Sequence, residues 1–437
     1  MADLIESTVA RRVWDSRGIP TVEVEISTTR GVRGRGIAPA GASTGRREVA
    51  ELRDGGSTLW GKDVRRAIEL VETRVAPALV GRDVDDLEGV DRVLGALDTL
   101  EPDLARLGGN TTTATSLAAL HAAAASRGIP AWKLLDPDPV HLPRPQIQIL
   151  GGGAHAAHRT TVQDFMVVPV SATSIEDALV HVAEIYRAVG DVLAARGPRR
   201  GVADEGGHWP EVSGTEDALD VLMAGIERTG LTPGIDVGIS LDIAATQFHQ
   251  HGLYVVGDGI AIPTSQWIEQ LVRICRDYPV ITLEDPAGED DTAGMRLAVA
   301  GTGPSTLVVG DDYLVTDAER IARAAEDGAV DAALIKVNQI GTVTAAANAV
   351  RSAREHGLAV IVSARSGETE DVSVAHLATG WSADFVKVGS ITRGERTAKW
   401  NELIRIDAEL GGMPLAPVPS RRPVASESVR ATPAASF

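Results

Sequence analysis

The chain has 437 residues, 44% of them hydrophobic, and a net charge of -18, and a single core rarely grows to that size, so we expect two domains. The negative balance argues against a nucleic-acid partner, because phosphate backbones are bound by clustered Lys and Arg. No stretch approaches the roughly 18 apolar residues of a membrane span, and the N-terminus lacks the basic and apolar regions of a signal peptide, so we expect a cytoplasmic protein without a membrane partner.

The first third of the chain predicts a small α+β domain. Alternation of apolar and polar residues at 21–26 and 32–37 indicates two strands of an antiparallel sheet. Helical patterns follow at 64–79 and at 111–125, the second very rich in Ala. A Pro-rich run at 137–145 indicates a linker, and we place the first domain at residues 1–137.

The pattern of apolar residues changes after the linker. Short apolar runs each end in a charged residue, and these charged residues follow one another at intervals of 22 to 42 positions. Such spacing is typical of strand–helix units in a parallel sheet. The runs are 237–242, 280–284, 307–311, 333–336, 359–365 and 385–387.

So many units in a row favour a barrel, whose catalytic groups lie at the carboxyl ends of the strands. The alternative is an open, doubly wound sheet. It would suit a dinucleotide, but no Gly-x-Gly-x-x-Gly follows a strand here. We assign the barrel to residues 138–412. The remaining segment, 413–437, is rich in Pro, Ser, Ala and Arg, and this composition predicts disorder.

Three carboxylates end three successive strands: Asp242, Glu284 and Asp311. In a barrel they would meet at one mouth, where their mutual repulsion calls for a cation. Magnesium suits oxygen ligands that leave positions open for a substrate. The alternative is that each acid only caps the following helix.

Two lysines, Lys336 and Lys387, follow or interrupt buried apolar strands, although Lys is rarely buried without a partner. A metal and a second cation would favour the neutral amine, a usable base; the alternative is a salt bridge to the same acids. Glu205 precedes a Gly-Gly pair, a weak signal alone. The small-residue loop 41–45, with Ser43, could close over a ligand or be a simple linker.

Eight motifs, in order along the chain, resemble those of the enolase family. The resemblance runs from about the first ten residues to about Gly412. The motifs are Asp-Ser-Arg-Gly at 15–18, Gly-Ala-Ser-Thr-Gly at 41–45, Gln-Asp-Phe-Met at 163–166, Asp-Glu-Gly-Gly at 204–207, Leu-Glu-Asp-Pro at 283–286, Gly-Asp-Asp at 310–312, Ile-Lys-Val-Asn-Gln-Ile-Gly-Thr at 335–342 and Arg-Ser-Gly-Glu-Thr-Glu-Asp at 365–371.

The resemblance implies an α/β fold, an enolase-like modified (β/α)8 barrel with an N-terminal α+β cap domain. It implies one or two Mg2+ ions, the first held by Asp242, Glu284 and Asp311 and the second bound when the loop carrying Ser43 closes. Lys336 matches the base that removes the proton beside the substrate carboxylate, and Glu205 matches the acid that assists departure of hydroxide. The remaining site residues implied are Asp164 in a catalytic role and His155, Gln163, Arg365, Ser366 and Lys387 as contacts of the substrate, with the pair 365–366 matching the phosphate clamp. A homo-oligomer, a dimer or an assembly of dimers, is implied as well.

Several residues depart from the family pattern around this conserved centre. The family usually has Glu at Asp164 and His at Ala364, directly before the clamp arginine. Other departures are Ala40 for Ser, Gly151 for Asn, Thr246-Gln247 for Ser-Glu and His208-Trp209 for Phe-Ala. A preserved centre with altered surroundings indicates a changed substrate rather than a lost activity.

The resulting hypothesis is a magnesium-dependent lyase that forms an enolpyruvate product from a small phosphorylated or phosphonylated carboxylic acid. It is similar to the carboxyphosphonoenolpyruvate synthases of phosphinate antibiotic biosynthesis, which handle a carboxylate on phosphorus. Alternatives are an ordinary phosphopyruvate hydratase of glycolysis, a non-catalytic enolase-like binding protein, and a member of the racemase and cycloisomerase branches. Those branches resemble the chain in the metal carboxylates but lack the motifs at 41–45 and 336–342.

Overall fold

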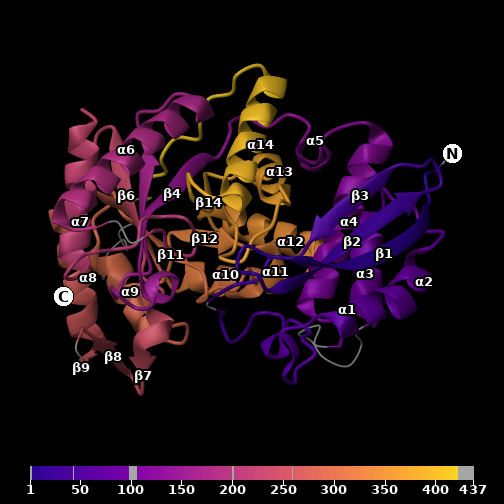
Figure 1. Ribbon diagram of the computed structural model, residues 1–437, viewed down its shortest axis with the longest axis horizontal. Coiled ribbons are helices and arrows are strands. Elements are labelled where there is room, and N and C mark those ends of the chain that lie inside the picture. Colours follow the sequence, from indigo (N-terminus) through magenta and orange to yellow (C-terminus); the bar gives the residue numbers. More distant parts are fainter. Residues whose placement is uncertain (1, 43, 98–105, 199–200, 258, 422–437) are drawn as a thin grey trace, which may run out of the picture.

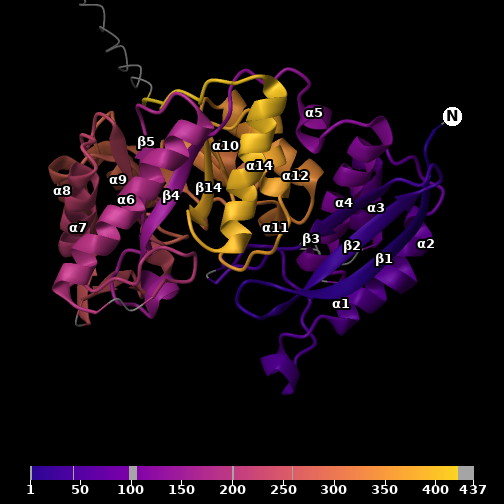
Figure 2. The same cartoon turned by 45° about the horizontal axis from the view of Figure 1, so that its top comes forward.

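The computed structural model describes residues 2–42, 44–97, 106–198, 201–257 and 259–421. A smaller N-terminal part of strands and helices lies beside a larger barrel, as both views show (Figures 1 and 2). The predicted boundary at residue 137 falls between α5 (Ala131–Leu135) and the first barrel strand, β4 (Arg144–Gly151). The predicted linker therefore ends at residue 143, because Arg144 and Pro145 already pair with β14 (Phe385–Ser390).

The N-terminal part is an antiparallel sheet packed on helices. Its strands are β1 (Ile5–Trp14), β2 (Pro20–Thr28) and β3 (Arg33–Ile37), in that order. The helical segments are α1 (Arg65–Leu70), a π-helical turn η2 (Val71–Val75), α2 (Ala76–Leu79), α3 (Leu87–Leu97) and α4 (Gly109–Arg127). The two predicted strands and two predicted helical stretches are confirmed, whereas β1 had not been predicted.

The barrel is closed by eight strands. They are β4, β5 (Asp164–Pro169), β6 (Val237–Asp242), β10 (Val280–Glu284), β11 (Leu307–Gly310), β12 (Ala332–Ile335), β13 (Ala359–Ser363) and β14, which pairs back with β4. The predicted barrel is confirmed and the open-sheet alternative is wrong. Neighbours are parallel except at β5, which runs antiparallel to β4 and to β6.

Helices surround the barrel, and α6 and α14 lie next to each other on its outside (Figures 1 and 2). These outer helices are α6 (Ile175–Arg196), α7 (Thr215–Arg228), α8 (Thr264–Asp277), α9 (Thr292–Gly301), α10 (Ala318–Glu326), α12 (Val343–Glu355), α13 (Ser373–Gly380) and α14 (Gly394–Leu410). The described elements also include a short α11 (Val337–Ile340) and a small sheet of β7 (His249–Gln250), β8 (Leu253–Val256) and β9 (Ile260–Pro263). Three 3-10 turns complete them: η1 (Thr58–Gly61), η3 (Gly153–Ala156) and η4 (Ala245–Phe248).

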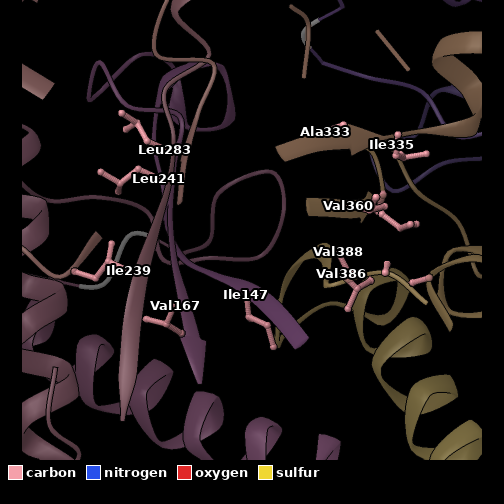
Figure 3. Close-up of a cluster of buried hydrophobic side chains, with 14 of the residues drawn as sticks. Ile147, Val167, Ile239, Leu241, Leu283, Ala333, Ile335, Val360, Val386 and Val388 are labelled. Carbon is pink, nitrogen blue, oxygen red and sulfur yellow. The ribbon is translucent and has the colours of Figure 1, made fainter. Parts of the chain in front are cut away.

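Alternation along the strands separates two buried layers. One set of side chains packs between the strands and the outer helices, and ten of its members are labelled in Figure 3, Leu241, Leu283 and Val386 among them. The alternate set, which includes Phe385, forms a separate cluster. Because strand side chains alternate with a period of two, Lys387 shares the face of Phe385, and the inner face changes from apolar to charged along the strand.

The described part of the predicted disordered tail is ordered. Leu415 forms a bridge with Leu142 and is buried, and Ala416 is fully buried. Arg421 donates to the carbonyls of Val299 and Thr306. These contacts correct the prediction for residues 413–421, since a composition rich in Pro, Ser, Ala and Arg does not exclude docking of single side chains; residues 422–437 lie outside the described part. None of the described helices combines the length and the apolar character that crossing a membrane requires.

Candidate active site at the barrel mouth

Charged side chains from different strands meet at one end of the barrel. Asp242 is the last residue of β6 and pairs in register with Glu284, the last residue of β10. On its other side Asp242 pairs with Asp164, the first residue of β5. Because β5 runs against its neighbours, its beginning lies where the other strands end. This reversal places Asp164 among the strand-end acids.

Lys387 connects two of the predicted metal ligands. Its Nζ lies 2.8 Å from Asp242 Oδ2 and 2.7 and 2.9 Å from the two carboxylate oxygens of Glu284. Burial would lower the pKa of Lys387, but the charges of Asp242 and Glu284 outweigh it and raise that pKa well above its usual value. Burial, with repulsion from Asp242, raises the pKa of Glu284.

Lys336 forms a second buried ion pair. Its Nζ donates to Asp311 Oδ2, and Gln339 Nε2 donates to the other oxygen of that carboxylate at 2.8 Å. Burial opposes the charge of Lys336, but Asp311 outweighs it, so the pKa of Lys336 is raised. Arg365 and Lys387 act in the opposite direction and partly offset the carboxylate; the neutral amine was expected beside a bound metal and stays a prediction. Both lysines make the ion pairs that the alternative interpretation anticipated.

The donor set fits a magnesium ion in chemistry and in charge. Asp242, Glu284 and Asp311 supply only oxygen ligands, which Mg2+ prefers. When ionised, the three carboxylates carry three negative charges. Lys336 and Lys387, the two lysines bonded to them, carry two positive charges, so one negative charge is left over. A cation would also compete with Lys387 for the same oxygens.

The three acids do not form one compact cluster. Within the described ranges, two groups have ligand atoms that all lie within 4.8 Å of one another: His155 with Asp164 and Glu205, and Asp285 with Asp311 and Asp312. The Asp285 carboxylate accepts the backbone N–H groups of Asp311 and Asp312 at 2.9 and 2.7 Å. Asp285 therefore holds Asp311 in place, with its own oxygens already bonded.

His155 lies between Asp164 and Glu205 in a second buried cluster. His155 Nδ1 lies 2.8 Å from Asp164 Oδ1, and His155 Nε2 lies 3.8 Å from Glu205 Oε1. Burial opposes the imidazolium, yet Asp164 and Glu205 outweigh it and raise the pKa of His155 to about 9. Burial raises the pKa of Glu205 and so favours its protonated form.

Asp164 is incompletely bonded, although its side chain is fully enclosed. Its Oδ1 accepts from both His155 and Gln148, while its Oδ2 has no hydrogen-bond partner among the described residues. Gln163, the preceding residue, donates to Asp242 Oδ2 at 3.2 Å and accepts from Gln247 Nε2. The site therefore includes both members of the predicted pair at 163–164.

The predicted phosphate clamp lies just beyond β13 and is contacted by the N-terminal part. Arg365 donates a hydrogen bond to each carboxylate oxygen of Glu48, with N–O distances of 2.8 and 3.2 Å. Ser366 Oγ accepts the backbone N–H of Ala42 at 2.6 Å. Glu48 belongs to the segment that follows the loop 41–45. Ser43 itself lies outside the described residues, so its predicted role has no structural account here.

Sequence reasoning missed four partners of these groups: Glu48, Gln148, Asp285 and Gln339. Asp285 and Gln339 stand inside quoted motifs, directly after Glu284 and three residues after Lys336, so their position was a usable signal. Glu48 contacts Arg365, which lies more than 300 positions away in the sequence, and no local sequence pattern predicts such a contact.

Two family models match the chain. The model described as Enolase, N-terminal domain, matches residues 5–135. The model described as Enolase, C-terminal TIM barrel domain, matches residues 139–415. Together they span nearly all of the part of the chain that the structure describes.

Proposed function

From the premise that the chain belongs to the enolase family, we propose that it is a magnesium-dependent lyase. Its substrate is a 2-phosphoglycerate-like acid, from which it removes the α-proton and then hydroxide, which leaves as water, to give an enolpyruvate product. The observation that carries the proposal is the pairing of Lys336 with Asp311 beside Lys387, which joins Asp242 to Glu284. Burying clustered charges of this kind costs free energy of folding, and a non-catalytic binding protein would gain no function from it.

The chemistry requires help because proton removal beside a carboxylate puts two negative charges on one group. Bound magnesium would supply electrostatic stabilisation of that enediolate; a Lys base with one or two Mg2+ ions is the pattern already attributed to enolase-superfamily sites. Asp242, Glu284 and Asp311 would hold the ion.

Proton transfer and substrate binding are assigned to side chains of the protein. Lys336 takes the α-proton, for which it must be the neutral amine. Asp311 opposes that form, whereas Arg365 and Lys387 favour it, and a magnesium ion held by Asp311 would favour it further. Glu205, whose pKa is raised by burial, donates a proton to the departing hydroxide. Arg365 and Ser366 hold the phosphorus group of the substrate.

We further propose that the substrate carries an additional group on phosphorus, as in carboxyphosphonoenolpyruvate synthase. Ala364 supports this, because a methyl group stands next to the clamp where the family usually has an imidazole. An ordinary phosphopyruvate hydratase is the second candidate, favoured by the intact set of acids and lysines.

Proton exchange in heavy water tests the assignment of base and acid. With magnesium and 2-phosphoglycerate, Lys336→Ala should lose exchange of the α-proton, since no base faces it. Glu205→Gln should retain some exchange while enolpyruvate formation, followed by ultraviolet absorbance, is lost. Exchange at the parental rate in Lys336→Ala would place the base elsewhere. A wild-type protein with neither exchange nor elimination on 2-phosphoglycerate or its phosphonyl analogues would refute the lyase proposal.

A further inference from the structure

Two fully buried cations on α14 hold the loop that carries the clamp. Arg396 and Lys399 stand one turn apart on this helix, and both side chains have no exposed surface. Basic side chains are almost never enclosed unless they are paired. Their partners therefore show what they do.

Arg396 bonds to backbone carbonyls. Its NH1 donates to the carbonyl of Arg365 at 2.6 Å and to that of Val388 at 2.8 Å, and its NH2 donates to the carbonyl of Ser366. Val388 directly follows Lys387 on β14. One planar guanidinium, whose donors stand in a fixed fork, thus ties the two clamp residues to the strand of Lys387.

Lys399 reaches the same loop by a second route. Its Nζ donates to the carbonyl of Thr369 at 2.7 Å and pairs with Glu368 Oε2 at 2.9 Å. The other oxygen of Glu368 accepts the backbone N–H of Arg365 at 3.0 Å. The N–H and the C=O of Arg365 are therefore both fixed from α14, one through Glu368 and one directly.

We propose that Arg396 and Lys399 are positioning residues for anion binding at the barrel mouth. They act through the backbone at 365–369 and set the distance between the clamp and Lys387. A displacement of about 1 Å in a binding group can cost roughly 100-fold in rate, so such support matters beyond stability. The inference rests on the proposed function, because it takes Arg365 and Ser366 as the clamp.

Arg144 offers a matched control. It is also a buried arginine whose guanidinium donates to carbonyls, among them those of Ala416 at 2.8 Å and Val170 at 3.1 Å. It begins β4 and so lies at the opposite end of the barrel. A change there should affect stability in the same way without touching the mouth.

The experiment compares Arg396→Lys, Lys399→Met and the control Arg144→Lys, with Arg365→Ala as reference. Calorimetry measures the Kd of 2-phosphoglycerate with magnesium and of magnesium alone, and thermal unfolding measures stability. We expect the two α14 variants to bind 2-phosphoglycerate roughly 10- to 100-fold more weakly, as for lost outer partners of a ligand, with unchanged affinity for magnesium alone. Arg144→Lys should lose stability only.

The outcomes distinguish the positioning role of Arg396 and Lys399 from the clamp role of Arg365. If Arg365→Ala weakens binding but neither α14 variant does, or if Arg144→Lys weakens it equally, the positioning role is overturned while the clamp stands. If Arg365→Ala binds like the wild type, the clamp assignment itself falls. Should Lys399→Met fail to fold, Arg396→Lys against Arg144→Lys, the same substitution at the two ends of the barrel, decides the outcome alone.

Discussion

At the scale of single residues, the mouth is organised by opposite charges that satisfy one another. Lys387 contacts both Asp242 and Glu284 within 3 Å, and Lys336 contacts Asp311. Removing one member of such a pair leaves a buried charge uncompensated, which is far more costly than replacing both. The departures from the family pattern are therefore informative, because they spare these pairs and fall on their neighbours.

If the proposed specialised substrate is right, reversing the predicted departures at Asp164 and Ala364 should raise activity as an ordinary hydratase. A Glu at 164 reaches one methylene further and could bring its second oxygen, which in Asp164 has no partner among the described residues, toward the substrate. A His at 364 fills the space beside the clamp. We expect Asp164→Glu with Ala364→His to raise turnover of 2-phosphoglycerate at least several-fold, measured as enolpyruvate absorbance. Adding Lys336→Ala should abolish the gain; a double variant no faster than the wild type would argue against a specialised substrate.

At the scale of elements, the packing of β3 on α4 depends on two glycines. A Cβ at Gly36 would lie 2.5 Å from the Ala114 carbonyl oxygen, and one at Gly34 would lie 2.1 Å from the Ala122 nitrogen. Both neighbours are backbone atoms of α4, which cannot move aside singly. The Ala-rich sequence of the helix and the glycines of the strand are thus two halves of one close contact.

Gly36→Ala should therefore lower the free energy of unfolding by about 1–3 kcal/mol, the usual range for overpacking. The matched control is Gly95→Ala on α3, where an added Cβ meets no atom within 4 Å. There Ala should be neutral or stabilise by up to about 1 kcal/mol, since Gly is unfavourable inside a helix. Chemical denaturation measures both variants. Equal effects would show that the β3–α4 contact yields more easily than its distances indicate.

At the scale of the whole molecule, cations should stabilise the fold in two ways: they screen the net charge of -18, and they can bind the acids at the barrel mouth. Screening by any salt relieves repulsion over the surface. A specific ion adds stability by mass action, about 2.7 kcal/mol at 100 times its Kd. The two effects can be separated at matched ionic strength.

Magnesium should raise the unfolding midpoint more than sodium chloride of equal ionic strength. Asp242→Asn should remove the excess, because it deletes a ligand charge while keeping the shape of the side chain. The control Asp63→Asn changes a buried acid that pairs with Arg12 at 3.0 Å in the N-terminal part, and it should keep the magnesium response. Scanning calorimetry gives the midpoints. An identical response in Asp242→Asn would exclude Asp242 as a ligand.

Much of the barrel could be predicted because its signals are local. The runs at 237–242 and 280–284 coincide with β6 and β10 to the residue, since an apolar stretch that ends in an acid is visible in any window of that length. The same locality explains what was missed. β5 runs backwards only because its hydrogen-bond partners are β4 and β6, and strand direction is a property of pairing, not of composition.

The sequence by itself determined which residues are chemically capable: acids at strand ends, two lysines in apolar strands, and a set of motifs in family order. Only the tertiary structure decided which groups meet. It paired Arg365 with Glu48 across the two parts of the molecule, and it placed Arg396 and Lys399 beneath the clamp. It also placed Lys336 beside Asp311, whose charge raises the pKa of that lysine. The energy of a buried charge depends on its distance to the nearest opposite charge, and that distance exists only after folding.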